Sequence, residues 1–314
     1  MIRKIIPKKP ITSSRAPTHS YVNSLLLEFI MRSSTRSQAI ALLEKDLSEI
    51  TSKDVLTSAF PFISNEKLLK KVVEKLIELN DGHELLDVLN DLTNPADQYV
   101  CPNAITILIE TVLEKKIDLL KNMTAKYTPD ANFSISYSLS LLVNAVNRDL
   151  LNDSEALGLV ATKSSDFSIR LKSLEKLKER RLKDGLVIVI KEGKQFLSLD
   201  AVNFLAGMVR SLKDKTTLLT LISYLPPIPE NNRTLYIAID KLIGMRQITQ
   251  LLIASAQSLE RFKSPRVPGK VAVQLGKQVN KLRNRVGLQF LIDHHPEVDV
   301  VAAAENRLLA LEKK

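Results

Sequence analysis

Glycine, cysteine and aromatic residues are scarce in this chain of 314 residues, and tryptophan is absent. With only 9 glycines, it has few of the positive-φ positions on which tight β-hairpins and phosphate-cradling loops depend. The single cysteine, Cys101, excludes an internal disulfide framework and a cysteine-rich zinc site. No run approaches the roughly 18–20 apolar residues that a membrane-spanning helix needs. These absences argue against all-β folds, Gly-rich nucleotide-binding folds and integral membrane proteins.

The overall composition is that of an ordinary globular protein. Hydrophobic residues make up 45% of the chain and charged residues 25%, so too much apolar surface needs burial for disorder to be the main state. The length allows one large domain or two ordinary ones.

Apolar residues recur at helical spacing along most of the chain. Residues 68–79 carry apolar side chains at i, i+3 and i+4 with lysines opposite, and Asn65 is placed to cap that helix. The same pattern predicts helices over residues 154–163, 200–212 and 232–244. The β-branched run 186–190 lies between such helices, so we interpret it as a buried helix and not as a strand.

The predicted helices occur in pairs that repeat at a regular interval. The turn residues before each pair are separated by 28 to 37 residues, with a mean of 33. A period of this size is typical of stacked helical hairpins. The sequence therefore predicts an all-α fold, an α-solenoid of about seven irregular helical hairpins. The turn residues used are Ser34, Ser64, Cys101, Pro129, Ser165, Leu199, Pro229 and Pro265.

Three helix openings share a turn proline followed by polar residues and a helix, at residues 102–106, 129–133 and 229–234. Together with the period, these openings resemble the pentatricopeptide repeat, in a degenerate form similar to helical-repeat proteins of fungal mitochondria. The resemblance covers about a quarter of the chain and assigns no base-reading residue. It implies an α-solenoid that contacts RNA in a mitochondrion or plastid, while a HEAT-like solenoid remains the alternative.

Charge is distributed unevenly along the chain, although the net charge is +10. Residues 1–40 hold seven basic residues against one acid, residues 41–160 hold 11 against 19, and residues 161–314 hold 27 against 15. We therefore divide the chain into a basic N-terminal arm or mitochondrial transit segment (1–22), a hairpin-repeat domain (23–262) and basic C-terminal helices (263–314). A basic C-terminal half favours a polyanionic partner.

Residues 261–292 contain no acid at all. If one helix continues past Lys270, the cations 270, 277, 281 and 285 form a basic stripe beside the apolar residues 271, 275, 279, 282 and 286. A row of cations one turn apart can follow a phosphate backbone with salt-dependent affinity. The more acid-containing run 170–183 is interpreted as an exposed helix face with intrahelical ion pairs. The predicted RNA-binding or phosphate-binding residues are Arg261, Lys263, Arg266, Lys270, Lys277, Lys281, Arg283 and Arg285.

No pattern of catalytic, cofactor-binding or metal-binding residues is evident. Phosphate-loop, dinucleotide-binding and nucleophile-elbow motifs do not occur. His294 and His295 are adjacent and precede Pro296, which indicates a turn before the last helix. Cys101 has no basic neighbour to activate it, so we expect a buried or incidental thiol.

The sequence thus predicts a non-enzymatic RNA-associated protein of mitochondrial gene expression, without a cofactor. Its partners would be mRNA or rRNA and other proteins of a ribonucleoprotein assembly, and it would be a mitoribosome component or a transcript stability or translation factor. Few aromatics accompany the cations, which favours phosphate contacts with structured RNA over base stacking. The alternative is a protein–protein scaffold in the cytosol or nucleus, in place of the mitochondrial matrix.

Overall fold

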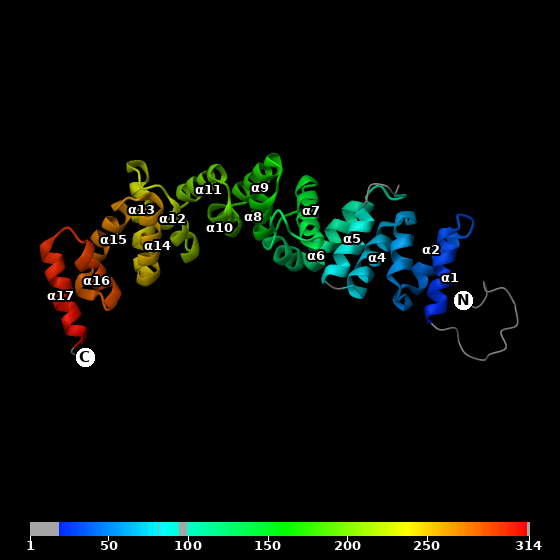
Figure 1. Cartoon of the computed structure of the whole chain (residues 1–314), viewed down its shortest axis with the longest axis horizontal. Coiled ribbons are helices and arrows are strands. Elements are labelled where there is room, and N and C mark those ends of the chain that lie inside the picture. The colour runs from blue at the N-terminus through cyan, green and yellow to red at the C-terminus, as the bar shows by residue number, and fades with distance from the viewer. Residues whose placement is uncertain (1–18, 81, 94–98, 313–314) are drawn as a thin grey trace. The chain divides into compact units, whose positions relative to one another are not determined.

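The computed structural model describes residues 19–80, 82–93 and 99–312. This part of the chain forms 17 α-helices and contains no β-strand (Figure 1), which confirms the predicted all-α class. Of the helices in these ranges, none combines the length and apolar character needed to cross a membrane. Most of the predicted N-terminal arm lies outside the described residues, and α1 begins at His19.

The chain forms two compact units, residues 1–152 and 153–314. In the first unit, α1 packs on α2 and α3, α3 on α4, and α4 on α6, while α7 packs on both α5 and α6. Every helix thus lies against a neighbour in chain order or one step beyond it. The helices of this unit are α1 (His19–Met31), α2 (Arg36–Asp46), α3 (Lys53–Ala59), α4 (Glu66–Leu79), α5 (Gly82–Thr93), α6 (Ala104–Ala125) and α7 (Phe133–Asn147).

Local sequence explains the ends of these helices. The Asn65 side chain accepts hydrogen bonds from the backbone N–H groups of Lys67 and Leu68, so the predicted cap of α4 is confirmed. Helix α6 is kinked at Lys116, where the backbone leaves the helical region (φ −136°, ψ 22°). Between α5 and α7, the Thr93 and Tyr137 hydroxyls lie 2.7 Å apart, and burial raises the pKa of Tyr137.

The second unit is an alternating array of ten helices (Figure 1). Helices α8, α10, α12, α14 and α16 pack in succession and form one layer, while α9 packs on α11 and α13 on α15 in the other. The helices are α8 (Ser154–Lys163), α9 (Phe167–Glu179), α10 (Lys183–Glu192), α11 (Gln195–Gly207), α12 (Lys215–Tyr224), α13 (Asn232–Gly244), α14 (Ile248–Phe262), α15 (Arg266–Gly276), α16 (Arg285–His294) and α17 (Val298–Glu312).

The sequence predicts the boundaries of α8 and α13 correctly, but it places α11 five residues too late. The β-branched run is confirmed as the buried helix α10, with Leu186 and Val189 fully buried. This helix crosses α8 at very close range: a Cβ added to Gly158 would lie 2.8 Å from the carbonyl oxygen of Gly185. The two glycines therefore permit a contact that a larger residue would prevent.

Three helices end in the same left-handed turn. Asp149, Arg181 and Arg246 have φ values of 60°, 55° and 58° and terminate α7, α9 and α13. The amide of each, and that of the following residue, hydrogen-bonds to carbonyls of the last helical turn. These turns are 32 and 65 residues apart, which corresponds to one and two of the predicted repeats.

Candidate nucleic-acid interface

The structure places the eight predicted phosphate-binding residues on several elements, not on one helix. Helix α15 ends at Gly276, and α16 begins only at Arg285. The predicted continuous helix through residues 270–286 is therefore wrong. Asn284 explains the break, because its side chain accepts a hydrogen bond from Gly287 N–H (2.8 Å) and starts a new helix there. Four of the expected apolar residues are buried, but Val286 is 57% exposed.

Four of the eight cations have contacts within the protein. The Arg261 guanidinium lies 3.9 Å from the centre of the Tyr224 ring, and the Lys270 ammonium lies 4.7 Å from that of Tyr236. Arg266 donates a hydrogen bond to the Pro227 carbonyl (3.1 Å), and Arg285 donates one to the Leu311 carbonyl (3.0 Å). These side chains connect helices, so part of their role is structural.

The other four cations are exposed and form no hydrogen bond or ion pair with the described residues. They do not lie together. Lys277 follows Gly276, which packs against His295 in the turn between α16 and α17. Asn284 lies instead beside the first turn of α14, where its amide donates to the Thr249 hydroxyl (3.1 Å). The four exposed cations are Lys263, Lys277, Lys281 and Arg283.

A second arrangement of cations appears where the helices of one layer lead into those of the other. The turns before α10, α12, α14 and α16 follow one another along one edge of the second unit. Lys241 at the end of α13 donates to the carbonyls of Arg210 (2.6 Å) and Leu212 (2.7 Å) in the turn before α12. Lys183 acts electrostatically on Asp214 of that same turn, and the Asn284–Thr249 bond joins the last two turns. We call residues 180–183, 208–215, 245–248 and 282–285 the basic edge.

The basic edge contains nine basic residues and one acid in twenty residues. All nine except the half-buried Lys183 are exposed. Arg181 and Arg246 occupy the left-handed positions that end α9 and α13. The nine are Arg180, Arg181, Lys183, Arg210, Lys213, Lys215, Arg246, Arg283 and Arg285.

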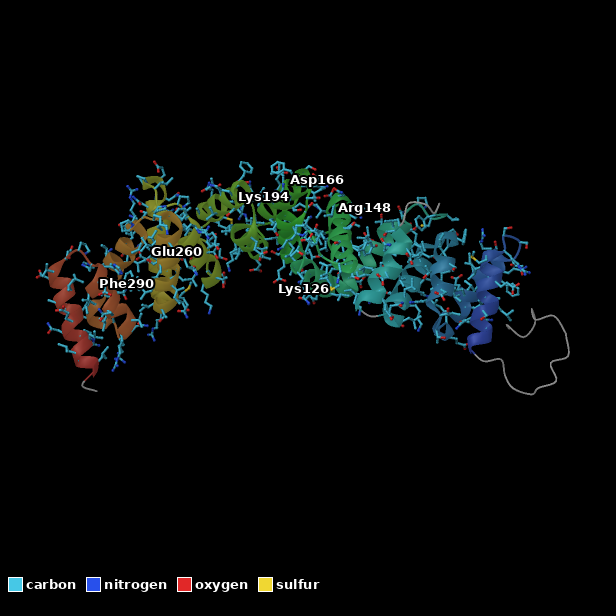
Figure 2. The ribbon with its side chains drawn as sticks, viewed as in Figure 1. Lys126, Arg148, Asp166, Lys194, Glu260 and Phe290 are labelled. Carbon is cyan, nitrogen blue, oxygen red and sulfur yellow. The ribbon has the colours of Figure 1, made fainter. Side chains whose placement is uncertain are left out.

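The turns at the other ends of these helices have a different character. Lys163 pairs with Glu192 (3.4 Å), and the Arg266–Pro227 bond joins two further turns. Lys191 and Tyr224 line one groove of about 300 Å³, so these turns also follow one another. We call residues 164–167, 193–195, 225–232 and 263–266 the opposite edge; they hold three basic residues and two acids. Asp166 and Lys194 of this edge lie on the upper side of the second unit in Figure 2.

The acid of the basic edge is occupied by the backbone. Burial by itself would raise the pKa of Asp214, but hydrogen bonds from the backbone and hydroxyl of Thr217 (2.6 and 2.7 Å) and the nearby Lys183 lower it. The carboxylate therefore caps α12 as an anion. A capping carboxylate with these partners neutralises little of the positive charge around it.

Of the predicted residues, only Arg283 and Arg285 belong to the basic edge, so the sequence missed the other seven cations. They are separated along the chain and come together only because every second turn lies at the same edge. A signal was present, since Arg181, Lys213, Arg246 and Arg283 recur at intervals of 32, 33 and 37 residues. That interval matches the repeat period.

The run 170–183 differs from the predicted exposed face. Arg170 and Lys176 are buried, with 7% and 8% of their surface exposed. Helix α9 contacts α8, α10 and α11, and these neighbours cover part of the face that a single helix would leave in solvent. Lys178 forms its ion pair with Asp200 of α11 (2.9 Å), not within its own helix.

Other chemistry-bearing residues have structural positions. Cys101 is buried in the turn before α6, as expected. The Nδ1 atom of His295 accepts a hydrogen bond from Glu297 N–H (3.0 Å) in the turn before α17. Within ranges 19–80, 82–93 and 99–312, no three His, Cys, Asp or Glu residues are grouped so that they could hold a metal ion. Comparisons with protein-family models, curated proteins and solved structures found no match to this chain.

Proposed function

We propose that this chain is a non-enzymatic helical-repeat protein that binds RNA through the phosphates facing its basic edge. The observation that carries the proposal is the difference between the two edges of the second unit. Nine cations and one acid lie on the basic edge, against three cations and two acids on the opposite edge. Surface charge of one sign on one side of a fold favours a polyanion, because each neutralised phosphate releases counterions.

The proposed architecture is an α-solenoid of about seven irregular helical hairpins. Three features support it: the mean spacing of 33 residues between predicted turns, the packing of helices α8 to α16 in two layers, and the left-handed helix ends 32 and 65 residues apart. Stacked repeats of one kind place equivalent turns at one edge. A cation repeated in each turn then becomes a continuous surface.

The proposed setting is mitochondrial gene expression, as a mitoribosome component or a factor for transcript stability or translation. The acid-free residues 1–22 support import into the matrix, since transit segments are basic and rich in hydroxyl groups. Other proteins of a ribonucleoprotein assembly would contact the remaining surface.

Binding of the full chain to RNA over a salt series tests the proposal. A protein that neutralises several phosphates loses affinity linearly on a log–log scale, with a slope of roughly −0.7 to −0.9 per phosphate contact. We expect a slope of at least about −3 for the wild-type chain. Absence of measurable RNA binding at low salt would overturn the proposed function.

A matched pair of double variants tests the assignment of the edge. Lys213→Glu with Arg283→Glu reverses two exposed cations of the basic edge, and Lys194→Glu with Lys263→Glu reverses two on the opposite edge. Both change the net charge by the same amount. We expect the first pair to lower affinity roughly ten-fold or more and to reduce the salt slope by about 2, because two phosphate contacts are lost. Equal losses from both pairs would contradict the assignment.

Two cell experiments test the setting. Fractionation should recover the chain in mitochondria, whereas a cytosolic pool with residues 1–22 intact would contradict import. Co-purification with and without ribonuclease separates partners held through RNA from those held through protein contacts. Loss of the ribosomal partners on ribonuclease treatment is the expected result.

The alternative function, a protein–protein scaffold, is favoured by one observation on the opposite edge. Phe167, Phe196 and Ile228 are 51%, 65% and 46% exposed in three of its turns. Repeated exposed apolar side chains are typical of protein-binding surfaces. Partners that survive ribonuclease treatment and are lost on Phe196→Ser would support this function.

A further inference from the structure

The basic edge lacks the side chains that proteins use to contact unpaired bases. Its twenty residues include no Phe, Tyr or Trp. Proteins that bind single strands stack bases on aromatic rings, and each stacked base contributes strongly to affinity. Two nearby tyrosines, Tyr224 and Tyr236, lie on other parts of the unit and have cations over their rings. Stacking is therefore not a source of affinity here.

The polar side chains that could read base edges are also occupied. The Asn284 carbonyl oxygen accepts from Gly287 N–H, and its amide donates to Thr249. Gln247 donates to the Met245 carbonyl (3.2 Å), and Asp214 accepts from Thr217. Only cations remain available for contacts, and cations by themselves bind phosphates without regard to sequence.

The turns that carry these cations are held in place. The Lys241 and Asn284 hydrogen bonds tie successive turns together, and Arg181 and Arg246 are fixed by hydrogen-bonded helix ends. Packed helices lie roughly 8–10 Å apart, so helices of one layer place their four turns over about 30 Å. This length is close to one turn of a nucleic-acid duplex, roughly 34–36 Å for B-form DNA.

We propose that the basic edge binds a base-paired segment of RNA through its phosphates, without reading its sequence. The inference rests on the proposed RNA-binding function and adds the form of RNA that is bound. A duplex presents its phosphates in a fixed, regular arrangement and hides its bases, which suits a rigid row of cations without aromatic rings. An unpaired strand offers its binding energy mainly through bases that this edge cannot stack.

Fluorescence anisotropy with the full chain tests the inference. The probes are a 20-base-pair RNA duplex, a second duplex of unrelated sequence and a 20-nucleotide oligouridine, which forms no base pairs. We expect the two duplexes to bind within about two-fold of each other and at least about ten-fold more tightly than oligouridine, at one salt concentration. Oligouridine binding as tight as the duplexes, or a ten-fold difference between the duplexes, would overturn the inference but leave RNA binding intact. Binding of none of the probes would instead overturn the proposed function.

The edge variants make the test specific to this surface. Lys213→Glu with Arg283→Glu should remove most of the preference for duplex, whereas Lys194→Glu with Lys263→Glu should keep it. If the preference survives the first pair while circular dichroism shows a folded chain, the duplex binds elsewhere and the inference is wrong. The single variant Arg246→Gln provides a milder change at a fixed helix end, and we expect a loss of about three-fold for duplex.

Discussion

The ammonium group of Lys241 lies 2.6 Å from the carbonyl oxygen of Arg210 and 2.7 Å from that of Leu212. A cation of α13 thus satisfies two backbone carbonyls in the turn before α12. Lys241 is half-buried, so its charge serves the structure of the basic edge more than contact with a ligand. It holds two successive turns together.

Replacing Lys241 with Met should destabilise the protein while keeping most of the aliphatic packing. We expect the free energy of unfolding to fall by about 1–2 kcal/mol, because two charge-assisted hydrogen bonds are lost. Urea unfolding followed by circular dichroism measures the change. Lys215→Met is the control, since Lys215 is exposed and has no hydrogen bond or ion pair with the described residues. An equal loss in both variants would show that the contact contributes nothing.

Gly185 lies at the tightest crossing in the second unit, and its substitution should be severe. An added Cβ would lie 2.1 Å from the Ser154 carbonyl oxygen, and Gly185 N–H also donates to the Ser154 hydroxyl (2.9 Å). We expect Gly185→Ala to lower the free energy of unfolding by about 2 kcal/mol through overpacking. Gly207→Ala meets no neighbour within 4 Å and should stabilise α11 by about 0.5 kcal/mol. Unfolding midpoints that move in the same direction would contradict this contrast.

Arg246 combines an unfavourable backbone conformation with a place on the basic edge. Its φ of 58° costs a non-glycine residue about 1–2 kcal/mol, which glycine avoids. We expect Arg246→Gly to leave stability unchanged or raise it by up to about 1 kcal/mol, and to weaken RNA binding. Arg246→Val should weaken both, because a β-branched residue suits this conformation least. Thermal unfolding and anisotropy on the same samples separate the two effects.

Asp214 should make stability depend on pH at acidic values. Its folded-state pKa is lowered from 3.8 despite burial, chiefly by the Thr217 hydrogen bonds. Its contribution is therefore present above the unfolded pKa and is lost as pH falls through the folded value. We expect Asp214→Ala to cost about 1 kcal/mol at pH 7. The difference from wild type should shrink as the pH falls below 3.8, and a constant difference down to pH 2 would contradict the cause.

Local patterns predicted much of the helical structure. Helix α8, helix α13, the Asn65 cap and the helical state of the run 186–190 all follow from side-chain spacing and capping chemistry, which act within one turn. The kink at Lys116 likewise falls at the boundary between two predicted helices. The prediction failed at residues 277–284, where Asn284 competes with the helix for hydrogen bonds and the apolar spacing alone looks continuous.

The candidate interface was less accessible from the sequence, because a single run of cations attracted attention. Residues 261–292 contain no acid, yet Arg261 and Lys270 lie over tyrosine rings and Lys277 lies apart from Arg285. Conversely, Arg181, Lys213 and Arg246 stand in short turns that show no unusual charge when each is taken alone. Their relation depends on which turns share an edge.

By itself, the scarcity of glycine and of aromatic residues, with a helical period near 33, determined an all-helical chain whose C-terminal half is basic. Those properties depend on composition and on interactions between near neighbours. Only the tertiary structure decided which cations lie together, because helices that alternate in direction bring every second turn to one edge. It also decided which cations are consumed by contacts, since burial and hydrogen bonding between distant residues leave no local signal.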